Sequence, residues 1–131
     1  MIYQDNILEK TRQNSYFRQV LFTGDKSQLV VMEIKPGEDI GTETHSHVEQ
    51  ILFFLSGAGK VVADGRESTI KAGDVVIVKP GTEHNFVNTG SELLKIYTIH
   101  CPPNHIDSRV HKTKLEADED VADEDFGHSV K

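Results

Sequence analysis

Residues 36–57 read PGEDIGTETHSHVEQILFFLSG and combine two histidines with an apolar run. His45 and His47 are one residue apart, and the run Ile51 to Leu55 ends at Ser56-Gly57. Such a run predicts a buried strand that enters a turn. Because successive side chains of a strand point to opposite faces, an extended conformation would place both imidazoles on one face. Imidazole is the commonest metal ligand of proteins, so the pair is a candidate metal site.

A second stretch, residues 73–88, reads GDVVIVKPGTEHNFVN and adds a third histidine. Val75 to Val78 predicts another buried strand, and Pro80-Gly81 predicts the turn after it. His84 then stands at the start of the next predicted strand, where its side chain could join the first two imidazoles.

The two stretches together resemble the two motifs of the cupin superfamily. The first motif is a glycine, His-x-His, and a Glu or Gln separated by six residues from a closing glycine. The second is Gly-x5-Pro-x-Gly-x2-His-x3-Asn. The matching positions are Gly37, His45, His47, Gln50 and Gly57 in the first motif, and Gly73, Gly81, His84 and Asn88 in the second, where Lys79 stands in the proline position. Fifteen residues separate Gly57 from Gly73, which is similar to compact single-domain cupins, and the resemblance covers about residues 20 to 100.

The first motif departs from the family pattern in its spacing. Cupins have three or four residues between His-x-His and the Glu or Gln, whereas this chain has two before Gln50 and one before Glu49. Strict alternation from His47 favours Glu49 as the ligand, and counting back from Gly57 favours Gln50. We prefer the count from Gly57, because a hairpin fixes the register of its strand. The resemblance then implies His45, His47, Gln50 and His84 as metal ligands, with Glu49 as the alternative to Gln50.

The resemblance implies one divalent transition metal ion inside the barrel, namely Zn, Fe, Mn, Ni, Co or Cu. Three imidazoles and an amide leave its charge of +2 uncompensated, which favours a small anionic ligand, and Glu49 would reduce the charge to about +1. The implied function is binding of, and action on, a small anionic metabolite by oxygenase or sugar-isomerase type chemistry. Similar small bacterial cupins are of the mannose-6-phosphate-isomerase-like type. Non-catalytic binding or sensing is the alternative, because a fold does not select among activities. Glu49, Tyr97 and His100 are the candidate catalytic acids or bases, since each could reach the interior.

The rest of the chain predicts an all-β, antiparallel fold. Further strands are expected at Tyr16 to Phe22, Gln28 to Ile34 and Leu93 to His100, and Asp64-Gly65 predicts a hairpin between Gly59 to Ala63 and Ser68 to Lys71. Short strands separated by turns are typical of a sandwich or barrel. The cupin resemblance specifies a jelly-roll barrel with a short C-terminal helix or tail.

We expect three parts: an irregular N-terminal arm at residues 1–15, the barrel at 16–101, and a C-terminal extension at 102–131. Thr113 and Glu116 form a capping box that predicts a helix from about Lys114 to about Val121. Residues 116–131 hold seven acids and one lysine, a net charge of −6, against −1 for residues 1–115. The acidic residues are expected to form a solvated face or a frayed tail.

Composition and charge restrict the classes of partner that we expect. The body has no basic stripe that would neutralise phosphates, so nucleic acid is not an expected partner. No apolar run approaches the 18 residues of a membrane span. The first residues show no signal-peptide pattern, and the single Cys101 fits a reducing cytoplasm. The resemblance to small cupins, which commonly pair as dimers, implies a homodimer. The strand Tyr16 to Phe22 would leave an unpaired edge, so we expect the N-terminal segment at the interface.

Overall fold

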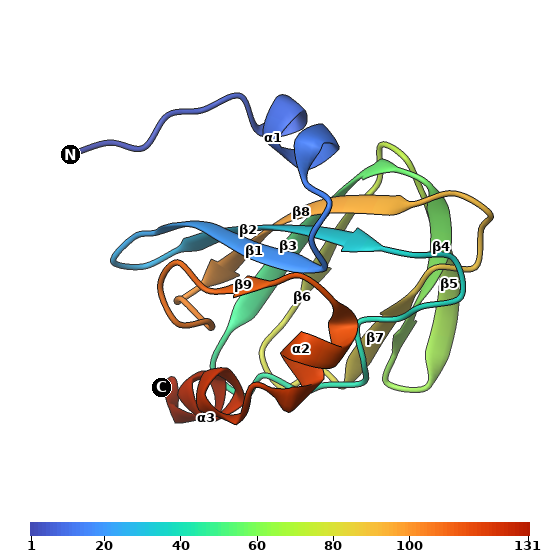
Figure 1. Cartoon of the computed structure of the whole chain (residues 1–131). Helices are drawn as coiled ribbons and strands as arrows, with labels where there is room; N and C mark the ends of the chain where they lie inside the picture. Colours follow the sequence, from blue (N-terminus) through green and yellow to red (C-terminus); the bar gives the residue numbers. More distant parts are fainter.

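Two antiparallel sheets face each other in the computed structural model, which describes residues 1–131 (Figure 1). The strands are β1 (Arg18–Thr23), β2 (Gln28–Ile34), β3 (Glu49–Ser56), β4 (Ala58–Ala63), β5 (Arg66–Lys71), β6 (Val75–Val78), β7 (His84–Val87), β8 (Leu94–Cys101) and β9 (Val110–His111). Their order is β6-β3-β8-β2-β1-β9 in the six-stranded sheet and β5-β4-β7 in the three-stranded sheet. This arrangement confirms the predicted all-β, antiparallel architecture.

The hairpin between β4 and β5 forms where Asp64-Gly65 predicts it. Both residues have positive φ, 49° for Asp64 and 78° for Gly65, as a two-residue type I′ turn requires. The register then pairs Ala63 with Arg66 across the turn. Turn chemistry alone therefore fixes this part of the fold.

The inner face of β8 changes from apolar to polar along the strand. Leu94 and Ile96 are fully buried in the core between the two sheets, whereas Thr98 and His100 are buried farther along the same face. Core residues from both sheets pack around the first pair; they include Val30, Met32, Ile34, Leu52, Phe54, Val61, Ile70 and Phe86. One end of the barrel is thus a hydrocarbon core, and the other end is lined by polar side chains.

Strand β1 is not the unpaired edge that the sequence predicts. It lies between β2 and β9, with Arg18 opposite His111 and Gln19 opposite Val110. The sequence could not show this, because β9 is only two residues long and comes from a loop that follows the barrel in the chain. The edges of the large sheet are β9 and β6. The strand predicted at Val75 to Val78 therefore forms as β6 but is only partly buried, because as an edge strand it leaves Val75 and Ile77 exposed.

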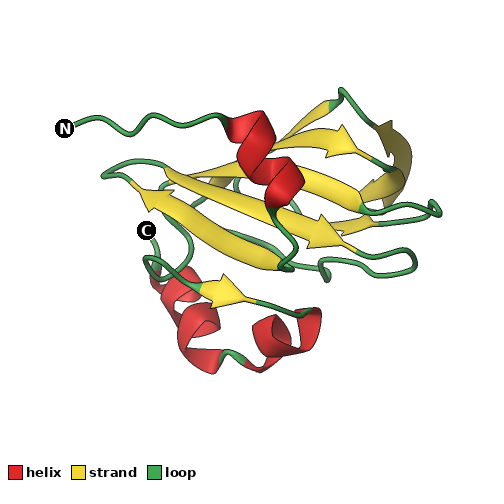
Figure 2. Ribbon diagram, turned by 45° about the horizontal axis from the view of Figure 1, so that its top comes forward, coloured by secondary structure: helices red, strands yellow, loops and turns green.

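Three short helices flank the sheets: α1 (Ile7–Gln13), α2 (Lys114–Glu119) and α3 (Val121–Ser129). Helix α1 packs against β8, β2 and β3, and α2 and α3 lie on the opposite side of the molecule (Figure 2). The arm expected to be irregular therefore contains a helix, which Asn6 caps by accepting the backbone N–H of Glu9. Helix α2 begins where the capping box predicts, with Thr113 accepting the backbone N–H of Glu116. None of the three is long and apolar enough to span a membrane.

Candidate metal centre

Three side chains converge at the polar end of the barrel. Glu43 and His84 are neighbours in an isolated β-bridge, and His45 follows Glu43 by two residues. Nε2 of His45 lies 3.4 Å from Oε1 of Glu43, and Nε2 of His84 lies 4.0 Å from the same oxygen. One ligand atom from each residue falls within 4.8 Å of the other two, which is close enough to share one ion.

The His84 ring is oriented by a backbone contact. Its Nδ1 lies 2.8 Å from the carbonyl oxygen of Thr82, and a carbonyl can only accept, so Nδ1 carries the proton. In the neutral ring Nε2 then keeps its lone pair. This nitrogen is buried and has no hydrogen-bond partner. Metal-binding histidines are commonly held in this way, with the other ring nitrogen donating to a carbonyl.

Glu43 remains ionised at the centre of the cluster. Burial acts to raise the pKa of its carboxyl group. The contact with His45 and the charges of His45 and Arg18 outweigh burial and lower this pKa to about 2. The cluster therefore presents a carboxylate beside the two histidine rings.

Gln50 and His100 add two buried polar groups beside the cluster. They face each other across β3 and β8, and the His100 ring centroid is 6.3 Å from that of His45. The Gln50 amide donates to Oγ1 of Thr98 at 3.2 Å, which leaves Oε1 buried without a partner. Buried polar atoms are normally hydrogen-bonded, so the unpaired atoms of His45, His84 and Gln50 fit a site built for a bound cation.

The structure does not bring His47 into this cluster. His47 is exposed, and it lies in a loop because β3 begins only at Glu49, so strand alternation does not apply to it. Within β3 and β8 alternation does apply. It turns Gln50 and His100 inward, and it turns Glu49 and Tyr97 to the outer face, where Tyr97 stacks on Phe53 at 4.8 Å.

Glu43 was missed in the sequence, although its position carried a signal. Four residues separate His45 from Gln50. Cupins have three or four residues between the second histidine of the first motif and its Glu or Gln. The motif therefore reads Glu43-x-His45-x4-Gln50, with Glu43 where a histidine is expected. This alternative alignment of the motif also accounts for the unusually short spacing from His47 to Gln50.

A cavity of about 420 Å³ opens beside the cluster. Its walls come from the barrel end, from the segment after β8 and from the two C-terminal helices; they include Arg18, Glu43, His45, Asn104, His105 and Asp123. The chain that follows the barrel thus covers the end where the polar groups lie.

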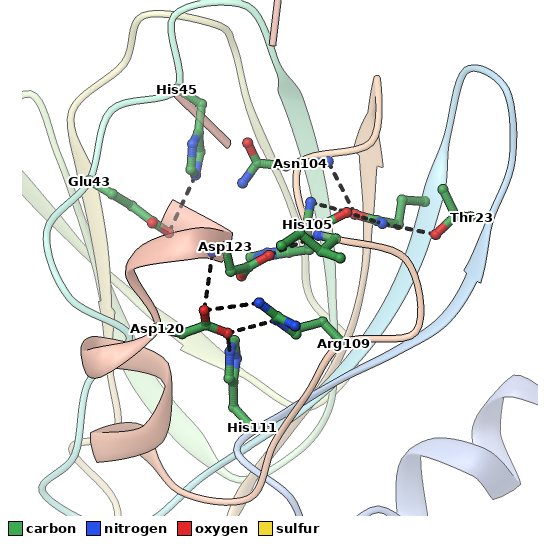
Figure 3. A network of polar contacts seen from close by, with 11 residues as sticks. Thr23, Glu43, His45, Asn104, His105, Arg109, His111, Asp120 and Asp123 are labelled. Carbon is green, nitrogen blue, oxygen red and sulfur yellow. Dashed lines mark hydrogen bonds and ion pairs between the residues drawn. The ribbon is translucent and has the colours of Figure 1, made fainter. Parts of the chain in front are cut away.

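Two acids of the C-terminal extension, Asp120 and Asp123, hold this cover in place (Figure 3). They correct the expectation of solvated acids for these two positions, whereas the other five acids of residues 116–131 are exposed as expected. Asp123 is only 5% exposed and accepts from Nδ1 of His105 and from the backbone N–H of Ile106, each at 2.8 Å. Asp120 lies 2.8 Å from Nε2 of His111 and 2.7 Å from Nε of Arg109. Counting charge along the chain could not reveal these contacts, because their partners lie in the preceding loop and in β9.

Comparisons with known proteins agree with the fold. A family profile described as "Cupin domain" matches residues 30–100. The chain is 40% identical over 127 residues to the uncharacterized protein YrkC of Bacillus subtilis, an alignment that covers 92% of this chain and 66% of that protein. It is 32% identical over 68 residues to an oxalate-binding protein of Thermotoga maritima, covering 52% of this chain and 56% of that protein.

A solved structure resembles the whole fold. The crystal structure of BH2720 from Bacillus halodurans superposes with a TM-score of 0.86 at 37% identity, covering 89% of this chain and 93% of that one. The similarity therefore includes the C-terminal part of the chain as well as the barrel.

Proposed function

The chain belongs to the cupin superfamily, and from that premise we propose that it binds one divalent transition metal ion through Glu43, His45 and His84. The ion would sit in the barrel and bind a small anionic metabolite, on which the protein acts. One observation carries this proposal: two buried imidazole nitrogens without hydrogen-bond partners face one carboxylate within 4.0 Å. Gln50 is the fourth donor that the interior offers.

The donor set narrows the chemistry. Two histidines and one carboxylate are typical of non-haem Fe(II) oxygenases, and the same ligand types also bind Zn. With Glu43 bound, the net charge of the site is about +1, which still favours an anionic ligand. A divalent ion in this position supplies Lewis-acid or redox chemistry to what occupies its open positions. Oxygenase chemistry is therefore our first proposal, ahead of sugar isomerisation.

His100 is the side chain best placed to move a proton. Burial lowers its pKa well below the ordinary value, and the nearby charges of His105 and His45 act in the same direction. The ring is therefore neutral at pH 7, and its Nδ1 has no hydrogen-bond partner. His100 does not line the cavity itself, but its ring centroid lies 6.3 Å from that of His45, so it is our candidate for proton transfer at the metal site. Glu49 and Tyr97 are not included in this role, since both lie on the outer face.

Metal content of purified variants tests the metal site. After loading with Fe(II), Mn(II) or Zn(II) and dialysis, we expect one ion per chain in the wild type. Glu43→Gln and His84→Ala should lower metal affinity about 100-fold or more, since changes even around a metal site cost 10- to 100-fold. His47→Ala is the matched control and should keep its ion. Full occupancy in His84→Ala, or loss of the ion in His47→Ala, would contradict the proposed ligand set.

A second candidate is binding without turnover, which the similarity to an oxalate-binding protein favours. Turnover of a metabolite panel by the metal-loaded protein would support the enzyme. Thermal stabilisation by a metabolite that is not consumed would support the binding protein instead.

We further propose that the chain works in the cytoplasm, where its single Cys101 would stay reduced, and that it works as a homodimer.

A further inference from the structure

Arg18 is a buried cation without an anionic partner; its guanidinium carbon lies 5.3 Å from the centroid of the Phe17 ring. Arg18 is the first residue of β1, its exposed fraction is 9%, and it lines the same cavity as Glu43 and His45. No carboxylate oxygen lies within 4.0 Å of its guanidinium, and its Nε has no hydrogen-bond partner. Burying a charge without an anionic partner is energetically unfavourable. Because this unfavourable charge lies at a cavity wall, we infer that it pairs with a ligand that enters the cavity.

The acids around Arg18 are already engaged. Glu43 contacts the imidazoles of His45 and His84, and Asp123 accepts from His105 and from a backbone N–H. These acids help Arg18 to remain charged without pairing with it. Burial lowers the pKa of Arg18, and the fields of Glu43 and Asp123 act to raise it. The guanidinium donors are therefore free to bind a ligand.

We propose that Arg18 is the anion-binding residue of the cavity and that its ligand is a small carboxylate. This inference deepens the proposed function, because the same ligand would reach the Glu43 cluster across the cavity. A guanidinium matches a carboxylate with two parallel N–H···O bonds. Phosphate carries about −1.5 to −2 charges at pH 7. That charge is concentrated on one group, so Arg18 alone would have to compensate it beside Glu43 and Asp123. A dicarboxylate of the same total charge would present one carboxylate to Arg18 and the other to the ion proposed at the Glu43 cluster.

Calorimetric titration of the full-length protein, dialysed free of unbound metal, tests the assignment. The probes are oxalate, malonate and succinate, with oxamide as the neutral analogue of oxalate and inorganic phosphate as the other anion. We expect at least one dicarboxylate to bind, and oxamide and phosphate to bind at least tenfold more weakly than that dicarboxylate. Arg18→Gln should weaken dicarboxylate binding at least tenfold, and Arg18→Lys should be intermediate because it keeps the charge without the planar fork. Arg66→Gln removes an exposed arginine of β5 and should change nothing.

Three further results would overturn the assignment: no dicarboxylate binding in the wild type, phosphate binding more tightly than every dicarboxylate, or unchanged dicarboxylate affinity in Arg18→Gln. The melting temperature of the ligand-free protein distinguishes a role of Arg18 in ligand binding from a role in stabilising the fold. Removing an unpaired buried charge should leave it unchanged or raise it, whereas a clear fall would show that Arg18 supports the fold instead.

Metal content measured on the same samples separates this inference from the proposed metal site. Arg18→Gln should keep the ion that His84→Ala loses. Unchanged carboxylate binding in Arg18→Gln would reject the subsite and leave the metal site standing. Arg18-dependent carboxylate binding in a wild-type protein that holds no metal would support the subsite and reject the metal site.

Discussion

At the scale of single residues, Gly57 fixes the position of β3 relative to β8 and thereby the orientation of Gln50. Its φ is +89°, and a Cβ atom built there would lie 2.6 Å from the carbonyl oxygen of Leu93. Only glycine fits both constraints. Because Gly57 follows β3 directly, it holds the end of that strand against the start of β8, and the register of the two strands turns Gln50 inward.

Replacing Gly57 should lower the unfolding free energy, and Gly37 is a control that separates the effect of positive φ from that of the contact with Leu93. Gly37 has a similar φ of +80° but nothing within 4 Å of a built Cβ. Gly37→Ala should therefore cost only the left-handed conformation, about 1–2 kcal/mol of unfolding free energy. Gly57→Ala should cost at least twice as much, because the backbone of Leu93 must also move. Urea unfolding of the two variants measures the difference, and equal losses would show that the contact is unimportant.

At the scale of elements, Asp120 joins the C-terminal helices to the barrel. Its side chain accepts the backbone N–H of Asp123, which caps α3, and it also contacts His111 of β9 and Arg109. The hydrogen bond from His111 lowers the pKa of Asp120; burial opposes this, and the bonds from Asp123 and Arg109 reinforce it, so that the pKa is about 2. One carboxylate therefore fixes a helix end and an edge strand together.

This pKa gives a pH dependence with a definite sign. The pKa is lower in the folded state than the value of about 3.9 expected in the unfolded chain. The stabilisation is therefore fully present above about pH 4 and is lost as the pH falls toward 2. Asp120→Asn should lower the unfolding free energy by about 1 kcal/mol at pH 6, allowing for solvent screening.

The difference between Asp120→Asn and wild type should shrink as the pH approaches 2. Asp125→Asn, an exposed acid of the same helix, should match wild type throughout. Urea unfolding at a series of pH values provides the measurement, and a difference independent of pH would show that the charge of Asp120 is not its source.

At the scale of the whole molecule, the exposed apolar surface bears on assembly. Val75 and Ile77 of the edge strand β6 are 53% and 59% exposed. Exposed apolar edge strands tend to pair with other chains. Since β9 covers β1, the argument that placed the N-terminal segment at a dimer interface no longer holds, and we place the predicted interface at β6.

Sedimentation at tens of micromolar protein tests this placement, a concentration at which an interface of micromolar affinity is occupied. We expect a dimer for the wild type and a shift toward monomer for Ile77→Lys, because a charge would be buried at the interface. Leu115→Lys changes an equally exposed residue of α2 and should remain dimeric. A wild-type monomer, or a dimer that survives Ile77→Lys, would contradict the placement.

The sequence by itself determined strands β1 to β8, the hairpin between β4 and β5 and the start of α2. These features depend on local physics: alternation of apolar residues, the left-handed preference of Asp64-Gly65, and the hydroxyl of Thr113 beside the backbone N–H of Glu116. The motif spacing also contained enough to point to Glu43, had the distance from His45 to Gln50 been preferred over the His-x-His pattern.

Only the tertiary structure decided which polar groups meet. Glu43 and His84 are far apart in the chain and become neighbours through one β-bridge, and Arg18 reaches their cavity from β1. Asp123, in a segment that composition describes as solvated, is buried against His105. Burial and ion pairing depend on what the rest of the chain places nearby, and neither periodicity nor net charge carries that information, because both are properties of neighbours in sequence.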